Sequence, residues 1–115
     1  MRKIVIFAFK GDPMCFIHVL LNALDLHNRG LGGKVVIEGE AVKLIPDIAA
    51  EGHPLHGLYT DARKANLIDG VCYACSKKLG AADAVAEEGL ELLKTMSGHV
   101  SMADYIKDGY EIVTM

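Results

Sequence analysis

The chain has 115 residues, a hydrophobic content of 51% and a formal net charge of −3. A single domain spanning residues 1–115 is expected, because a chain of this length can bury a sizeable apolar core without disulfides. The lysines and arginines form no cluster and tryptophan is absent, which argues against nucleic acid or a membrane surface as a partner.

The three cysteines are an odd number, in a chain whose first apolar run is too short for a signal peptide or a bilayer span. This combination predicts a cytoplasmic protein with free, reactive or metal-bound thiols, because disulfide frameworks belong to oxidising compartments. No motif calls for a cofactor. The glycine-rich segment 30–33 follows a helix and precedes a strand, which is the reverse of a phosphate-binding loop.

Hydrophobic periodicity and turn residues predict alternating strands and helices. In chain order they are a strand over 4–9, a helix over 14–29, a strand over 34–38, helices over 41–50 and 55–65, a strand over 68–74, a helix over 76–88, a strand over 90–93, a helix over 101–107 and a strand over 110–115. Asp12 and Pro13 supply the N-cap and first-turn proline of the first helix. Pro46 is expected to kink or shorten the helix over 41–50, and Gly80 to break the helix over 76–88.

This order of elements predicts an α/β domain with a three-layer α/β/α, flavodoxin-like architecture around a mostly parallel sheet of five strands. In such a sheet the loops that follow the strands gather at the carboxyl edge, where ligands bind. The chemically capable residues expected at that edge are Lys10, Asp12, Cys15, Glu38, Glu40, Cys72, Cys75, Ser97 and His99.

Cys72 and Cys75 form a CxxC motif where a predicted strand runs into a helix. The N–H groups and the macrodipole at a helix start favour a thiolate, so the motif predicts a nucleophile that carries sulfur on one thiol while the other resolves it. The alternative is that both thiols only pack. Cys15, near the start of the first helix, and His99, in the loop before the last helix, are the supporting candidates.

A metal site is a competing interpretation of the same thiols. His53 and His56 precede the CxxC motif by a short segment, and together with Cys72 and Cys75 they would make a tetrahedral set suited to zinc. This set requires that the two pairs meet in the fold. The main prediction contains no metal.

The segment Val71-Cys-Tyr-Ala-Cys-Ser-Lys-Lys-Leu-Gly80, with the opening strand Lys3-Ile-Val-Ile-Phe7, resembles the DsrE/DsrF-like family of small sulfur-relay proteins. The resemblance implies a flavodoxin-like (DsrEFH-like) fold, assembly into trimers or hexamers, and sulfur carried as a persulfide on one cysteine. The family cysteine maps onto Cys72, and Cys75 is an additional thiol one helical turn later. The partners implied are sulfur donor and acceptor proteins.

The predicted function is therefore a cytoplasmic sulfur carrier or sulfurtransferase that relays persulfide sulfur on Cys72 or Cys75. Which cysteine is the nucleophile, and whether the chain is an enzyme, are open at this point. The alternative is a non-enzymatic oligomeric module that binds zinc or another ligand at the carboxyl edge. A thioredoxin-type oxidoreductase is a weaker third interpretation, because no tryptophan precedes the motif.

Overall fold

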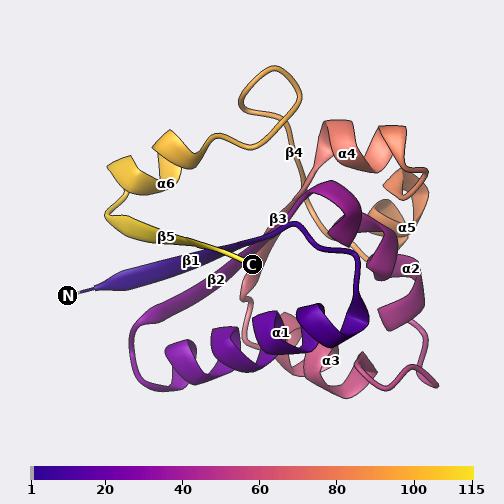
Figure 1. Cartoon of the computed structure of the whole chain (residues 1–115), viewed down its shortest axis with the longest axis horizontal. Coiled ribbons are helices and arrows are strands. Elements are labelled where there is room, and N and C mark those ends of the chain that lie inside the picture. The colour runs from indigo at the N-terminus through magenta and orange to yellow at the C-terminus, as the bar shows by residue number, and fades with distance from the viewer. Residues whose placement is uncertain (1) are drawn as a thin grey trace.

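Five strands form one sheet in the computed structural model, which describes residues 2–115 (Figure 1). The strand order is β4-β3-β2-β1-β5, and every neighbouring pair is parallel. The strands are β1 (Lys3–Ala8), β2 (Gly32–Ile37), β3 (Ile68–Cys72), β4 (Leu92–Leu93) and β5 (Tyr110–Thr114). The predicted α/β class with a five-stranded sheet is confirmed, and the sheet is parallel throughout.

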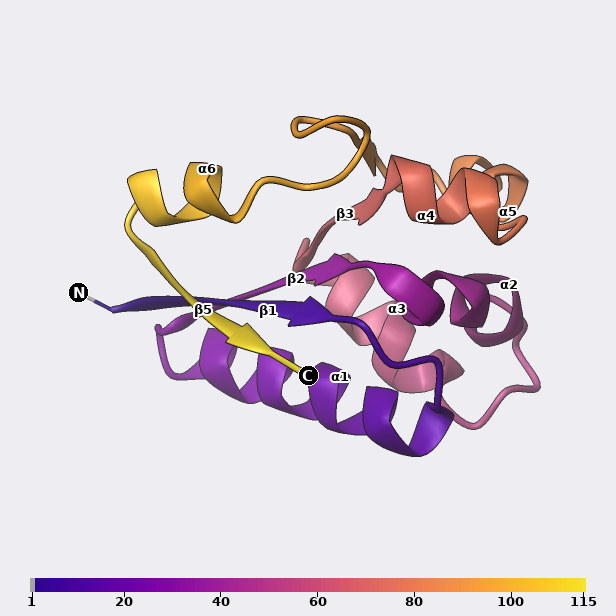
Figure 2. The ribbon, with the colours of Figure 1, turned by 45° about the horizontal axis from the view of Figure 1, so that its top comes forward.

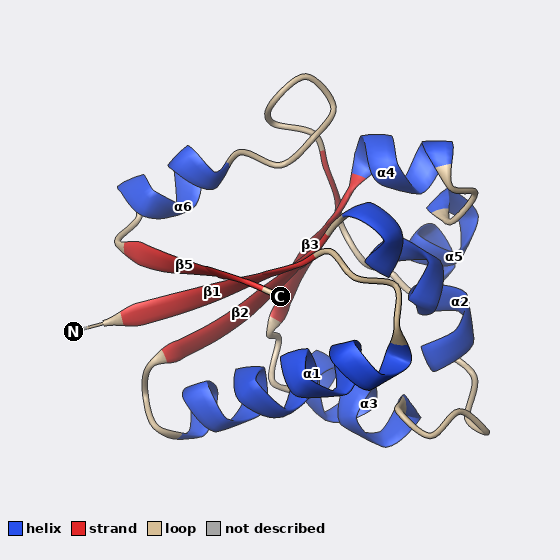
Figure 3. Ribbon diagram, in the orientation of Figure 1, coloured by secondary structure: helices blue, strands red, loops and turns tan. Residues whose placement is uncertain are grey.

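Helices connect the strands and lie on both faces of the sheet (Figure 3). They are α1 (Pro13–Asn28), the 3₁₀-helix η1 (Gly39–Leu44), α2 (Ile45–Ile48), α3 (His56–Lys64), α4 (Tyr73–Lys78), α5 (Ala82–Glu87) and α6 (Met102–Lys107). These three layers are those of the flavodoxin-like class, although flavodoxin itself has the strand order 2-1-3-4-5. Within residues 2–115, no helix has both the length and the apolar character needed to cross a membrane.

Proline and glycine divide two of the predicted helices. The segment 41–50 is not one helix but the end of η1 followed by the short α2, because Pro46 lacks an N–H and is tolerated only in a first helical turn. Gly80 has a positive φ of 74° and separates α4 from α5. The third strand ends at Cys72 and not at residue 74, so α4 begins at Tyr73.

The two faces of the sheet carry cores of different size. Figure 2 shows α1 and α3 on one side of the sheet and α6 on the other. The larger core lies on the first side and includes the buried residues of α1, α2, α3 and α5. The smaller core lies under α6, and its buried members are Val5, Phe7, Val36, Cys72 and Val100.

The neighbouring strands β3 and β4 send the chain toward opposite faces. After β3 the chain enters α4 and then α5, whose buried Val85 belongs to the larger core. After β4 the chain crosses to α6, which packs on the smaller core. In open α/β sheets such a divergence leaves a crevice at the carboxyl ends of the strands, and ligands bind there. A ligand site is therefore expected at the ends of β3 and β4.

Candidate functional site

Cys72 joins the end of β3 to the start of α4. It is the last residue of the strand and the N-cap of the helix, and its Sγ accepts a hydrogen bond from the N–H of Cys75 at 3.4 Å. The Ser76 hydroxyl donates to the Cys72 carbonyl oxygen at 2.7 Å, which ties the first turn of the helix to the strand end. Cys72 is fully buried at 0% exposure, whereas Cys75 is half-buried. The CxxC motif therefore has one inner and one outer thiol.

A tight turn in the loop between β4 and α6 brings His99 to these thiols. Ser97 and Gly98 have positive φ angles of 50° and 86°, the conformation of a type I′ turn. On either side of them, Met96 and His99 exchange two backbone hydrogen bonds of 2.9 and 2.8 Å. The Gly98 carbonyl accepts a hydrogen bond from the Ala74 N–H at 2.8 Å, which fastens the turn to the first turn of α4.

The Nδ1 atom of His99 lies close to both sulfurs. It is 3.3 Å from the Cys72 Sγ and 3.9 Å from the Cys75 Sγ, and all three atoms lie within 4.8 Å of one another. The cluster runs from buried Cys72 through half-buried Cys75 to exposed His99. It is therefore closed on the side of the core and open on the side of solvent.

Burial keeps Cys72 protonated. The pKa of the Cys72 thiol is raised to about 12, mainly by desolvation and in addition by the nearby Cys75 thiol and Glu38 carboxylate, while the hydrogen bond from the Cys75 N–H opposes this rise. In its neutral form with the proton on Nε2, His99 can accept the Cys72 S–H through Nδ1. The inner thiol is thus a hydrogen-bond donor at neutral pH.

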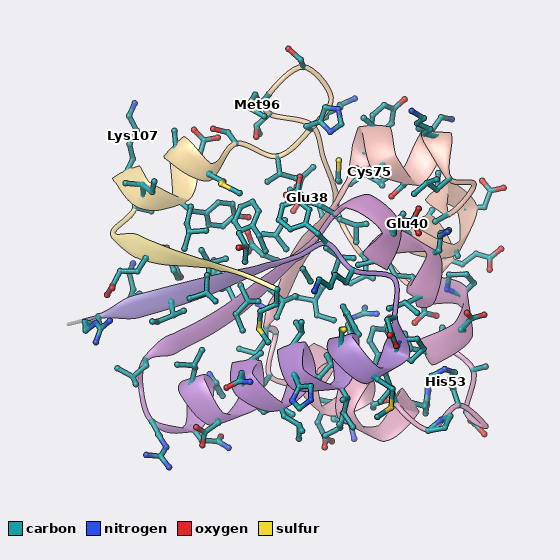
Figure 4. All side chains as sticks on the ribbon, viewed as in Figure 1. Glu38, Glu40, His53, Cys75, Met96 and Lys107 are labelled. Atoms are coloured by element: carbon teal, nitrogen blue, oxygen red, sulfur yellow. The ribbon has the colours of Figure 1, made fainter. Side chains whose placement is uncertain are left out.

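Glu38 is a buried carboxyl group beside the cluster. It follows β2 directly and is only 6% exposed. Burial raises the pKa of Glu38, whereas the charge of His99 and a hydrogen bond from the Val100 N–H lower it. The sequence placed Glu38 at the carboxyl edge but gave it no role. Figure 4 shows it with Cys75 and Met96 at this edge, between α4 and α6.

An open groove of about 380 Å³ leads from the surface to Glu38 and His99. Its walls are mostly apolar, and the exposed side chains of Phe9 and Met96 stand at its rim. The wall residues are Phe9, Glu38, Met96, His99, Val100, Ser101, Met102 and Ala103. A molecule in this groove would reach the imidazole that contacts both thiols.

The predicted set of four zinc ligands does not form a common site. The His56 Nδ1 lies 2.9 Å from the Ile48 carbonyl oxygen, and the His53 Nδ1 accepts the Leu55 N–H at 3.0 Å. His53 lies in the segment before α3 and His56 is the first residue of that helix, and Figure 4 shows His53 far from Cys75. Within residues 2–115, the histidine, cysteine and acidic side chains that gather closely enough to hold a metal are Cys72, Cys75 and His99.

Cys15 does not join the cluster either. It lies in the first turn of α1, and that helix packs against the larger core on the opposite face of the sheet. Cys15 and the CxxC motif both lie near the carboxyl ends of the strands, as predicted, but on opposite faces of the sheet. Of the two supporting candidates named from the sequence, the structure brings His99 to the CxxC motif and leaves Cys15 apart.

No protein-family model matches the chain. It is 31% identical over 99 residues to the uncharacterised protein MJ0733 of Methanocaldococcus jannaschii, and the match covers 86% of this chain and 78% of that protein. An uncharacterised protein of Archaeoglobus fulgidus is 43% identical over 51 residues, which cover 44% of this chain and 82% of that protein. The solved structure of BT1422, a conserved protein of unknown function from Bacteroides thetaiotaomicron, has a TM-score of 0.70 and 18% identity and covers 96% of this chain and 93% of its own, a likeness of fold.

Proposed function

The chain belongs to the family of the archaeal protein MJ0733, and we propose that it is a sulfur carrier of the DsrE/DsrF-like kind, which accepts sulfane sulfur as a persulfide on its CxxC motif. The observation that carries the proposal is the cluster of a half-buried thiol, a buried thiol and an imidazole nitrogen within 4.8 Å of one another. The cluster lies at the carboxyl edge, where open α/β sheets bind ligands.

The outer thiol, Cys75, is the proposed nucleophile. A thiolate must reach the outer sulfur of the donor persulfide, and half-buried Cys75 can be approached from solvent while Cys72 cannot. The pKa of Cys72, raised to about 12, also leaves that thiol uncharged at neutral pH. This assignment departs from the family register, which maps the sulfur-carrying cysteine onto Cys72.

The proposed transfer requires only the donor persulfide, this chain and the acceptor thiolate. The Cys75 thiolate attacks the sulfane sulfur of a donor persulfide, a new S–S bond forms on Cys75, and the donor leaves as a thiolate. His99, 3.9 Å from the Cys75 Sγ, takes the thiol proton before attack. An acceptor thiolate then removes the sulfur by the same exchange.

Cys72 offers a second outcome for the persulfide. Its thiol can attack the inner sulfur of the Cys75 persulfide, which forms the Cys72–Cys75 disulfide and releases hydrosulfide. In that step the two cysteines are oxidised and the sulfane sulfur is reduced. His99 first gives the Cys75 proton to the departing donor thiolate, and the proton of Cys72 then passes to its Nδ1, which is 3.3 Å from that sulfur.

The experiment is intact mass spectrometry of the reduced chain after exposure to a low-molecular-weight persulfide. Wild type and the Cys15→Ser control should each gain one sulfur atom, because Cys15 lies on the other face of the sheet. Cys75→Ser should gain none. A wild type that shows neither a sulfur adduct nor the Cys72–Cys75 disulfide contradicts the proposal, as does a Cys75→Ser variant that gains sulfur as readily as wild type.

The proposal includes a cytoplasmic location and a homo-oligomer, a trimer or hexamer as the resemblance implies, served by sulfur donor and acceptor proteins. An exposed apolar surface near the edge strand β5 supports self-association. Val113 is exposed there, beside a hollow of about 360 Å³ lined by Ile4, Ile6, Asn22, Leu26, Val113 and Met115. Apolar patches of this kind commonly mark contacts between subunits.

A further inference from the structure

We infer that Cys72, Cys75 and His99 form a binding site for a soft divalent metal ion such as zinc, with one coordination position open to solvent. The three candidate ligand atoms already lie within 4.8 Å of one another. The inference concerns metal binding and does not depend on the proposed sulfur-carrier function.

The distances fit tetrahedral zinc. Zinc binds thiolate sulfur at about 2.3 Å and imidazole nitrogen at about 2.0–2.1 Å, and at a tetrahedral angle these lengths place sulfur and nitrogen about 3.6 Å apart. The observed separations of the His99 Nδ1 from the two sulfurs are 3.3 and 3.9 Å, one below and one above that value. Shifts of a few tenths of an ångström would bring each sulfur to the tetrahedral separation from Nδ1.

The charges and the local hydrogen bonds also suit a metal. Two thiolates and a neutral imidazole balance a dipositive ion. The bound site is therefore neutral, and the protein does not bury a net charge there. The thiol protons leave as the metal binds. The N–H of Cys75, which donates to the Cys72 Sγ at 3.4 Å, remains in place to stabilise the thiolate.

Glu38 is the candidate for the outer partner that a metal-bound histidine usually has. Because Nδ1 of His99 faces the sulfurs, Nε2 is left to carry a proton, and such N–H groups commonly donate to a carboxylate. Glu38 is buried and borders the same groove as His99. It would orient the ring without touching the metal.

Three protein ligands leave the fourth position of a tetrahedral ion vacant, as in zinc sites that bind water or a substrate. His99 is exposed and borders the apolar groove, so a small molecule in that groove could approach the ion. A metal ion and sulfane sulfur would compete for the same two thiols. Metal occupancy would therefore stop persulfide formation on Cys75 and act as a switch on the proposed carrier.

The test is an anaerobic titration of the reduced, chelator-treated full chain with Co²⁺. Wild type should bind one equivalent and show thiolate-to-cobalt charge-transfer bands with intense visible bands of tetrahedral cobalt, and Zn²⁺ should remove both. Cys75→Ser and His99→Ala should lose these bands. The Cys15→Ser control should keep them, and Glu38→Gln should keep them with an affinity about 10- to 100-fold weaker.

A wild type that shows only the weak spectrum of octahedral cobalt overturns the site, as does a tetrahedral spectrum that survives in both Cys75→Ser and His99→Ala. Circular dichroism establishes that the variants are folded, which is expected because neither Cys75 nor His99 is fully buried. The persulfide assay separates the two claims. Sulfur uptake without cobalt binding removes the metal site alone, and cobalt binding without sulfur uptake removes the carrier alone.

Discussion

Cys72 and Cys75 are three residues apart in the chain but differ in burial and in neighbours. Cys72 ends a central strand and packs with Phe7 and Val36 in the smaller core. Cys75 lies in the first turn of α4 at the boundary of both cores and is half-buried. The motif therefore contains one accessible thiol and one buried thiol.

The raised pKa of Cys72 predicts a loss of stability at alkaline pH. In the unfolded chain this thiol ionises near pH 9, whereas in the folded chain it stays protonated until about pH 12. Unfolding thus releases a proton between these values, and the free energy of unfolding falls by up to about 1.4 kcal/mol for each pH unit. The stabilising contribution is complete below pH 9 and is lost as the pH rises toward 12.

Urea unfolding of wild type and Cys72→Ala from pH 8 to 11 measures this effect. The difference in unfolding free energy should shift in favour of Cys72→Ala as the pH rises, because the tyrosines that also titrate are common to both proteins. Cys15→Ala serves as the matched control and should run parallel to wild type. Parallel curves for Cys72→Ala would show that the folded protein does not raise the pKa of Cys72.

At the scale of elements, the turn at residues 96–99 holds His99 against the CxxC motif. We expect Gly98→Ala to destabilise the fold by about 1–2 kcal/mol, because φ at this position is +86° and L-residues avoid the left-handed region. The new Cβ would lie 3.5 Å from the Ala74 Cβ, which is an ordinary contact, so the cost comes from the backbone. Sulfur uptake should slow as His99 moves.

Chemical denaturation and the rate of persulfide formation check the Gly98→Ala prediction. Gly52→Ala is the control, since Gly52 lies in the α2–α3 connection, needs no positive φ and has open space for a Cβ. It should match wild type in both measurements. Unchanged stability and uptake in Gly98→Ala would mean that the turn does not determine the position of His99.

Helix α6 has no fully buried residue and depends on a few specific contacts. The Tyr105 ring packs edge-on against Phe7 and Tyr110, and its hydroxyl donates to Asp69, which also pairs with Lys34 at 3.1 Å. Tyr105→Phe keeps the ring but removes the hydroxyl. We expect it to lower the free energy of unfolding by about 1.5–3 kcal/mol, the usual contribution of a hydrogen bond to a charged group.

Urea denaturation and amide hydrogen exchange measure that loss, and exchange should rise most in α6. The control is Tyr73→Phe, because the Tyr73 hydroxyl makes no hydrogen bond to any part of residues 2–115. It should stay within about 0.5 kcal/mol of wild type. Equal effects of the two substitutions would contradict the anchoring role of Tyr105.

At the scale of the whole molecule, the pattern of elements was predictable and their arrangement in space only partly so. Continuous apolar runs predicted the strands at 4–9 and 34–38, and Asp12 with Pro13 marked the start of α1, because these signals depend on local chemistry. The fourth strand was predicted over 90–93 but is confined to Leu92–Leu93, since pairing with β3 and not composition sets its length.

The candidate site was predictable to the same extent. The CxxC motif and its place between strand and helix are visible in the sequence, and topology placed His99 at the same edge. The burial of Cys72 and of Glu38 depends on which side of the sheet α6 covers, and the sequence carries no local signal for that. Cys15 is also separated from the cluster, because the two lie on different faces of the sheet.

The exposed apolar surface near β5 predicts self-association of the whole molecule. Sedimentation velocity should find wild type as an oligomer, and Val113→Glu should shift it toward the monomer, because a buried unpaired charge is costly in an interface. Ile106→Glu changes an equally apolar and more exposed residue on α6, on the other face of the sheet, and should leave sedimentation unchanged. A monomeric wild type would contradict this expectation.

The most direct test of the central claim locates the persulfide within the CxxC motif. After exposure to a persulfide donor and alkylative trapping, trypsin releases Cys72 and Cys75 together in the peptide 65–77, and fragment ions distinguish the two. We predict that the additional sulfur is on Cys75, the accessible thiol. Sulfur on Cys72 or Cys15 in its place, with Cys75 unmodified, would contradict the account.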